Sequence, residues 1–80
     1  MKFIADQRHS ALAALIIAKR KAVGITQQQV ADSLGQYQSF VARLESGQRR
    51  IDVVEFLDLA QILNFDAAKA LREIEKIGTK

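Results

Sequence analysis

The sequence predicts an all-α domain built from five helices, and three observations lead to this expectation. Apolar residues recur every three or four positions along most of the chain, which is the spacing of one helix face. The four glycines each fall where such a pattern stops, and glycine readily adopts the left-handed conformation that follows a helix. The 80 residues include no proline, the residue that usually interrupts helices. No alternating strand pattern competes with these signals.

The first predicted helix covers residues 10–23. Three consecutive basic residues at 19–21 lie in its last turns, where the helix dipole favours positive charge. Its core-facing stripe is expected to consist of Leu12, Leu15, Ile16 and Val23.

The second and third helices are predicted as a closely packed pair. Thr26 followed by Gln29 forms a capping box, so the second helix should begin at Gln27. The third helix covers residues 38–46. Two helices that cross steeply need a small residue where they touch and a left-handed turn between them, and Ala31 and Gly35 provide these. The apolar residues expected at the contact are Val30, Leu34, Val41 and Leu44.

The fourth helix should begin at Asp52, which with Glu55 forms a D-x-x-E start, and Asn64 can end it in a left-handed conformation. Asp66 then caps a fifth helix, which continues to about residue 77. The apolar face of the fourth helix is expected to contain Val53, Phe56, Leu57, Ala60 and Leu63, and that of the fifth Leu71, Ile74 and Ile77. With no linker or repeat, residues 1–80 should form a single domain whose core spans about residues 10–77.

Composition excludes several classes of protein. Nearly half of the residues are hydrophobic and 26% are charged, which is ordinary for a globular domain. The absence of cysteine excludes disulfides and thiolate metal sites, and a single histidine without clustered carboxylates leaves no nucleophile paired with a base. We therefore expect neither an enzyme nor a bound metal or cofactor. The chain also lacks a membrane-spanning run and the apolar core of a secretion signal, so we expect a cytoplasmic protein associated with the nucleoid.

Charge is distributed unevenly along the chain. Residues 1–50 contain eight basic and three acidic side chains, whereas residues 51–80 contain four basic and six acidic ones. The first part therefore carries +5 and the second −2. This asymmetry suits a protein that presents one face to a polyanion, although it is also compatible with an ordinary solvated surface.

Residues 26–47, TQQQVADSLGQYQSFVARLESG, have the layout of a helix-turn-helix that reads bases in the DNA major groove. Together with LxxAKRKAVG before them and the QRR that follows, they resemble the lambda-repressor-like helix-turn-helix family, also called the xenobiotic-response-element (XRE) type of regulator. The resemblance covers about residues 12–75. It implies a DNA-binding fold and a small transcriptional regulator, with double-stranded DNA as the partner.

The resemblance also implies roles for individual residues. Gln38, Ser39 and Arg43 match the base-facing positions of the recognition helix. Glutamine can pair with the edge of an adenine, and arginine with a guanine. Arg20 and Glu45 match a charge pair that ties the first helix to the third. The residues that match contacts to the DNA backbone are Gln27, Ser46, Gln48, Arg49 and Arg50.

Three residues depart from the family pattern. Tyr37 stands where a capping side chain is usual, so the third helix should lack a side-chain cap. Phe40 replaces a small polar residue and can pack on a neighbour or touch DNA. Ala42 offers no hydrogen bond at a position that is often polar. All three are candidate DNA contacts that make the recognised bases harder to predict.

The family resemblance leaves several functional alternatives open. A dimeric repressor or autoregulator that binds a partly palindromic operator is the first expectation, and the fifth-helix residues Leu71, Ile74 and Ile77 are candidates for the dimer contact. An antitoxin with a toxin partner and a restriction-modification controller use the same fold. A protein-interaction module that has lost DNA binding belongs to a different class, and the presence of Gln27, Gln38 and Arg43 argues against it.

Overall fold

Five helices make up the fold, as the sequence predicts, and no strand occurs among the residues that the structure describes. The structure is a computed structural model that describes residues 2–78, with side chains from Asp6 onward. The helices are α1 (Lys2–Val23), α2 (Gln27–Leu34), α3 (Gln38–Ser46), α4 (Val53–Leu63) and α5 (Ala67–Glu75).

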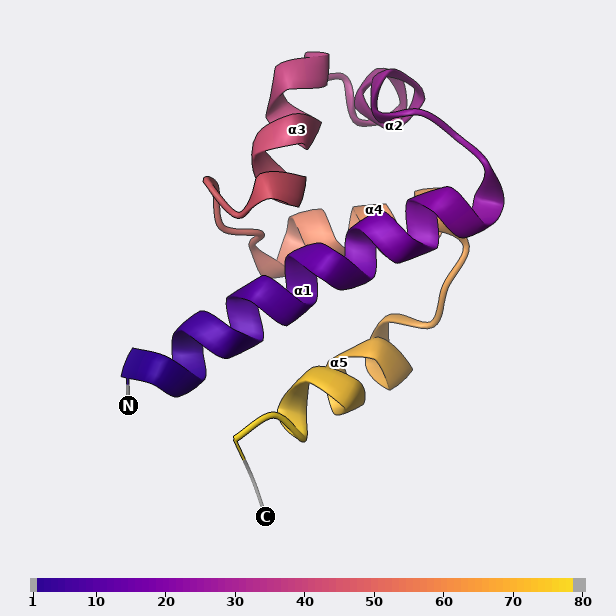
Figure 1. The fold of residues 1–80 in the computed structure, drawn as a ribbon. Coiled ribbons are helices and arrows are strands. Elements are labelled where there is room, and N and C mark those ends of the chain that lie inside the picture. Colours follow the sequence, from indigo (N-terminus) through magenta and orange to yellow (C-terminus); the bar gives the residue numbers. More distant parts are fainter. Residues whose placement is uncertain (1, 79–80) are drawn as a thin grey trace.

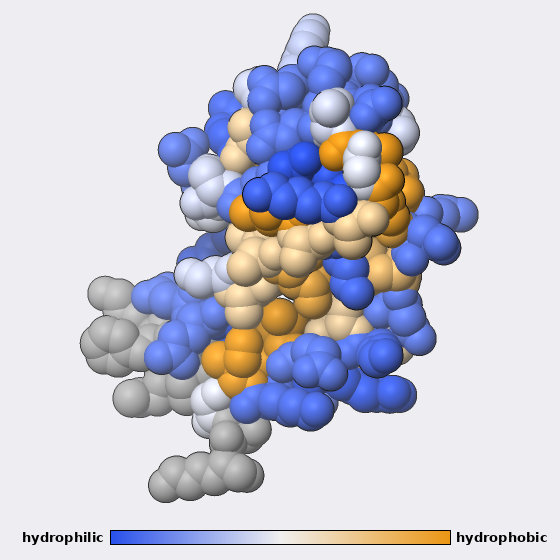
Figure 2. Space-filling view, turned by 45° about the vertical axis from the view of Figure 1, so that its right-hand side comes forward, coloured by the Kyte–Doolittle hydropathy of each residue, from blue (hydrophilic) through white to orange (hydrophobic). Residues whose placement is uncertain are grey.

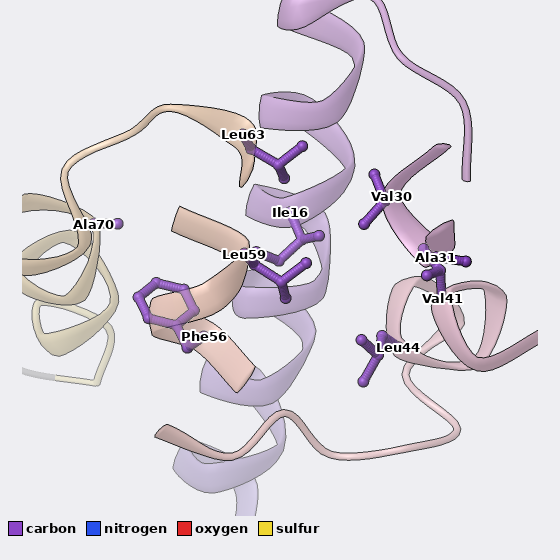
Figure 3. Packing of buried hydrophobic residues seen from close by; sticks show 9 residues of the cluster. All are labelled: Ile16, Val30, Ala31, Val41, Leu44, Phe56, Leu59, Leu63 and Ala70. Atoms are coloured by element: carbon purple, nitrogen blue, oxygen red, sulfur yellow. The ribbon is translucent and has the colours of Figure 1, made fainter. Parts of the chain in front are cut away.

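The long helix α1 crosses the middle of the molecule and organises the other four (Figure 1). Helices α2 and α3 lie on one side of it and α5 on the opposite side, with α4 packed behind. Apolar side chains from all five helices meet between these layers (Figure 3). The buried cluster consists of Ile16, Val30, Ala31, Val41, Leu44, Phe56, Leu59, Leu63 and Ala70. In the described part of the chain, no helix combines the length and apolar character needed to cross a membrane.

The boundaries of α2 and α4 follow the capping signals in the sequence. The hydroxyl of Thr26 accepts a hydrogen bond from the backbone of Gln29, whose side chain in turn accepts one from the Thr26 backbone. Asp52 and Glu55 form the equivalent box at the start of α4. Asn64 ends α4 with a φ of 58°, in the left-handed region that asparagine tolerates better than most residues. These predictions are confirmed.

Helix α1 begins earlier than predicted. It starts at Lys2 instead of residue 10, because the segment before Ser10 contains neither glycine nor proline to stop a helix. The added turns lack a periodic apolar stripe, so the pattern did not reveal them. They are nevertheless attached to the rest of the fold. Arg8 donates hydrogen bonds to the carbonyl oxygens of Glu75 (3.0 Å), at the end of α5, and of Ile77 (3.1 Å), in the turn that follows. Val23, predicted in the core, is 45% exposed at the other end of α1.

The buried face of α4 also differs from the prediction. Val53 and Leu57 are exposed, and Leu59, which the apolar pattern did not select, is completely buried. Eight of the eleven residues of this helix are apolar, so two neighbouring faces have acceptable helical spacing. Packing against α1, α2 and α5 selects the face that includes Leu59. Ile77 likewise lies in the turn after α5 and not within the helix.

Candidate nucleic-acid interface

Helices α2 and α3 form the predicted helix-turn-helix. Ala31 and Val41 are completely buried where the two helices meet, and the small alanine side chain allows a close approach. Gly35 follows α2 with a φ of 69°, which a residue with a Cβ adopts only with strain. This packing keeps the apolar side of α3 on the core and turns its polar side outward. The part of the molecule formed by α2 and α3, at the top of Figure 2, is predominantly hydrophilic, and apolar residues gather below it.

The outward side of α3 presents the three residues predicted to face bases. Gln38, Ser39 and Arg43 are all exposed. Ser39 and Arg43 lie one helical turn apart on the same face. Within the described residues, the side chains of Ser39 and Arg43 form no hydrogen bond, so both are free to bind an external group. The sequence interpretation placed these residues on one polar surface, and the fold brings them together there.

Gln38 belongs to a chain of side-chain hydrogen bonds that runs from the surface into the scaffold. Its Nε2 donates to Oε1 of Gln27 (2.6 Å), and Nε2 of Gln27 donates to Oε1 of Glu45 (2.9 Å). Glu45 accepts from both Nε (2.6 Å) and Nη2 (3.0 Å) of Arg20. The Arg20–Glu45 ion pair expected between α1 and α3 is therefore present, and it is largely buried. We call these four residues the Gln38 relay.

The loop between α3 and α4 is held by Arg49. Its Nη1 donates to Oε1 of Glu55 at 2.8 Å, and its guanidinium lies 4.5 Å from the centre of the Phe40 ring. Phe40 is half-buried and packs against the core. Phe40 therefore packs on its neighbours, and a contact with DNA stays a prediction. Arg49, expected to contact the DNA backbone, has three partners inside the protein: Glu55, the Phe40 ring and the carbonyl oxygen of Arg50.

The remaining candidate residues in and beside this loop differ in their exposure and in the contacts that their side chains make within the protein. The hydroxyl of Ser46 donates to the Arg43 carbonyl (3.2 Å) and accepts from the Gln48 backbone (3.4 Å), so it stabilises the end of α3. The Gln48 side chain is exposed. The exposed Arg50 contacts Nε2 of His9 on α1. Sequence reasoning assigned no role to His9, and no local pattern indicates this contact.

Two pKa shifts accompany the arginine–carboxylate pair of the loop. The hydrogen bond from Arg49 lowers the pKa of Glu55, with a smaller contribution from the Asp52 backbone, while partial burial opposes the shift. The same hydrogen bond raises the pKa of Arg49. On the other side of α3, the hydrogen bond to Glu45 raises the pKa of Arg20. Both arginines therefore remain charged under all ordinary conditions.

Tyr37 and Ala42, the other two candidate DNA contacts, differ in their exposure. Tyr37 precedes α3 without a side-chain cap, as its sequence position predicts, and the residue is 83% exposed. Ala42 is half-buried. Tyr37 can therefore reach a bound molecule, whereas Ala42 has only part of its surface available.

The residues considered for a dimer contact are distributed unequally. Leu71 is 45% exposed, while Ile74 and Ile77 are half-buried. Leu71 and Ile74 line an open groove of about 420 Å³ together with Arg8 and Arg72. Sequence reasoning missed Arg8, because nothing in the local pattern shows that it reaches the end of α5. In the part of the chain that the structure describes, no group of three or more His, Cys, Asp or Glu residues has the arrangement of a metal site.

Comparison with known proteins agrees with this architecture. A helix-turn-helix family model matches residues 16–69. An XRE-family like protein from Pseudomonas syringae pv. tomato is 39% identical with a TM-score of 0.88, over 96% of this chain and 94% of that one. The restriction-modification controller protein C.AhdI from Aeromonas hydrophila is 27% identical with a TM-score of 0.69, over 88% of this chain and 99% of that one.

A third structure supports the fold alone. The clp gene regulator ClgR from C. glutamicum has a TM-score of 0.77 at 19% identity, over 91% of this chain and 96% of that one. No curated protein sequence matches this chain. The family model nevertheless covers more than half of the residues, and it includes the whole of α2, α3 and α4. The chain therefore belongs to the XRE, or lambda-repressor-like, helix-turn-helix family of DNA-binding transcriptional regulators.

Proposed function

We propose that the protein is a dimeric repressor or autoregulator that acts in the cytoplasm and reads its operator through α3. Gln38, Ser39 and Arg43 choose the bases. One observation carries this assignment: these three side chains are exposed together on the outward side of α3, whose inward side is anchored by buried Val41 and Leu44. Such a helix can enter the major groove without losing its packing on the scaffold.

Contacts to the DNA backbone would supply most of the affinity and make it depend on salt. Arg50 and Gln48 are the residues of the α3–α4 loop best placed for this role, because both side chains are exposed. Gln27 retains one N–H of its amide after donating to Glu45, and that N–H can donate to a phosphate oxygen. Arg49 would contribute mainly by holding the loop against Phe40 and Glu55.

For the dimer, we propose a contact through the α5 face that includes Leu71 and Ile74, next to Ile77. Two-fold symmetry would then place two copies of α3 in half-sites about one helical turn apart. Leu71→Glu tests this contact, because it puts a charge on an exposed position and leaves the core intact. We expect the mass measured by sedimentation equilibrium to fall from dimer to monomer. An unchanged dimer would exclude this surface.

The test of DNA binding is selection of bound fragments from random duplex DNA at low salt, with the wild-type chain and an Arg43→Ala variant. We expect the wild type to enrich a partly palindromic site, and Arg43→Ala to lose preference at one base pair of each half-site. If the wild type enriches no site, the proposed function is wrong, and a protein-interaction module that has lost DNA binding becomes the better description.

A restriction-modification controller is a second candidate within the same class. It is favoured by the likeness to C.AhdI, which extends over nearly the whole length of both chains. The two candidates differ in the genes that are regulated and not in the chemistry of binding. A methylase gene beside the selected operator would favour the controller, and a toxin gene there would favour an antitoxin.

A further inference from the structure

Hydrogen bonds in the Gln38 relay are donated in one direction, from Gln38 to Gln27 and from Gln27 to Glu45, and the buried Glu45 sets this direction. A carboxylate can only accept hydrogen bonds, whereas a glutamine amide has one end that donates and one that accepts. Glu45 is buried, and both of its oxygens accept from Arg20. Gln27 must therefore turn its NH₂ group toward Glu45, and its Oε1 then faces Gln38. Gln38 in turn can only donate to that oxygen.

This direction determines what Gln38 presents on the surface. One N–H of its amide is used by Gln27, so the other N–H and Oε1 are left. One donor beside one acceptor matches N7 and the N6 amino group of adenine. If the relay ran the other way, Oε1 of Gln38 would be turned toward Gln27, and the NH₂ group with its two N–H donors would face outward. Two donors match O6 and N7 of guanine.

We propose that Glu45 is a positioning residue for base choice: through Gln27 it fixes the amide orientation of Gln38 and so favours adenine over guanine. This inference rests on the proposed function, because it concerns the bases that α3 reads. It gives the Arg20–Glu45 pair a second role beyond connecting α1 to α3. Arg20 holds the Glu45 carboxylate in place with two hydrogen bonds.

The test is Glu45→Gln, which keeps the shape of the side chain but lets position 45 donate or accept. Selection with Gln38→Ala first identifies the base pair that Gln38 reads. At that base pair, a bidentate contact provides roughly five- to 150-fold discrimination, and we expect Glu45→Gln to lose at least about threefold of the adenine-over-guanine preference. Preference at the base pair read by Arg43 should be unchanged.

Two further variants keep the test interpretable. Glu45→Gln leaves Arg20 partly buried without its partner and can unfold the chain, so the double variant Arg20→Met/Glu45→Gln is measured as well. It contains no unpaired buried charge, and we expect the same loss of preference. Glu73→Gln is the matched control: it removes one negative charge from the exposed Glu73–Lys76 ion pair, and α5 lies across α1 from the α2–α3 pair. It should leave the adenine-over-guanine ratio as in the wild type.

The outcomes separate the inference from the proposed function. Wild-type selection of adenine at the Gln38 position, followed by a reduced ratio in both Glu45 variants, supports the inference. An even loss of affinity for all sequences with an unchanged ratio shows a merely structural role and overturns it. Wild-type selection of guanine at this position overturns it too. If the wild type selects no site, the proposed function fails first and the inference fails with it.

A measurement on the free protein tests the relay without DNA. The side-chain NH₂ resonances of Gln27 and Gln38 should both shift in Glu45→Gln and stay in place in Glu73→Gln. If the Gln38 resonances are unaffected by Glu45→Gln, the two residues are not coupled, and the inference is wrong even when the protein binds DNA as proposed.

Discussion

Replacing Arg43 with alanine tests the proposed contact with a base, because the substitution should leave the fold almost unchanged. Arg43 is exposed in the last turn of α3, and among the described residues its side chain has no hydrogen-bond partner. Removing it should change the free energy of unfolding by less than about 0.5 kcal/mol. If Arg43 pairs with a guanine, its loss should cost about 1–3 kcal/mol on the selected operator, which is roughly a five- to 150-fold weaker affinity.

The pattern of the loss is more informative than its size. A base contact affects one base pair, so operators already altered at that pair should bind Arg43→Ala and wild type with nearly equal affinity. A phosphate contact would weaken binding to all sequences and lower the slope of log affinity against log salt by about 0.9. Because we assign Arg43 to a base, we expect the loss at one base pair and a slope close to that of the wild type.

Fluorescence anisotropy titrations at several salt concentrations measure both quantities, with operators that differ at single base pairs. Lys69→Ala serves as the control, since Lys69 is an exposed cation on α5, away from the α2–α3 surface. Uniform loss with a lowered salt slope would place Arg43 on the backbone and refute the assignment. Unchanged affinity on every operator would remove Arg43 from the interface altogether.

Five other variants test the loop, the core and the turn. Arg49→Ala should weaken binding about equally on all operators in the same titrations, since it releases the loop without removing a base contact. Leu59→Ala should destabilise the fold by about 2–5 kcal/mol, and Leu57→Ala by less than about 1 kcal/mol, in urea unfolding, because only Leu59 is buried. Gly35→Ala should cost about 1–2 kcal/mol through its left-handed φ alone, since a Cβ there meets no atom within 4 Å. The pKa of Glu55 is lowered in the folded protein, so ionised Glu55 stabilises the fold at pH values above its ordinary pKa near 4.5. This contribution is lost as the pH falls through the lower, folded-state pKa. In Glu55→Gln the unfolding free energy should therefore decline less between pH 6 and pH 3, with both pH values chosen to bracket that window.

Local signals predicted most of the fold because they depend on neighbouring residues. The Thr26–Gln29 box, the left-handed Gly35 and the Asp66 cap each specify a helix end by contacts within a few positions. The start of α1 could not be predicted in this way. The sequence of its first turns does not distinguish a helix from an irregular segment. These turns are attached to the fold by the hydrogen bonds from Arg8 to the end of α5, which involve residues distant in the sequence.

In the candidate site, too, local spacing could be predicted from the sequence, whereas contacts between distant residues could not. Helical spacing was sufficient to place Gln38, Ser39 and Arg43 on one surface. The partners of Arg49 could not be inferred, since the stacking on Phe40 and the pair with Glu55 join α3, the loop and α4 in three dimensions. The direction of the Gln38 relay is likewise a property of the assembled fold.

The departure at position 40 and the position of Arg49 explain each other. A small polar side chain at 40 would offer the guanidinium no aromatic face, and a partly exposed cation–π contact contributes about 0.5–1 kcal/mol. With Phe40 present, Arg49 connects α3 to Glu55 of α4 on one side, while Glu45 connects α3 to Arg20 of α1 on the other. Helix α3 is thus held to α1 by an ion pair and to α4 through Arg49, which stacks on Phe40 and pairs with Glu55. A helix held in this way keeps its orientation when a base-reading side chain changes, so substitutions at Ser39 or Arg43 should alter the preferred operator without altering how the protein docks on DNA.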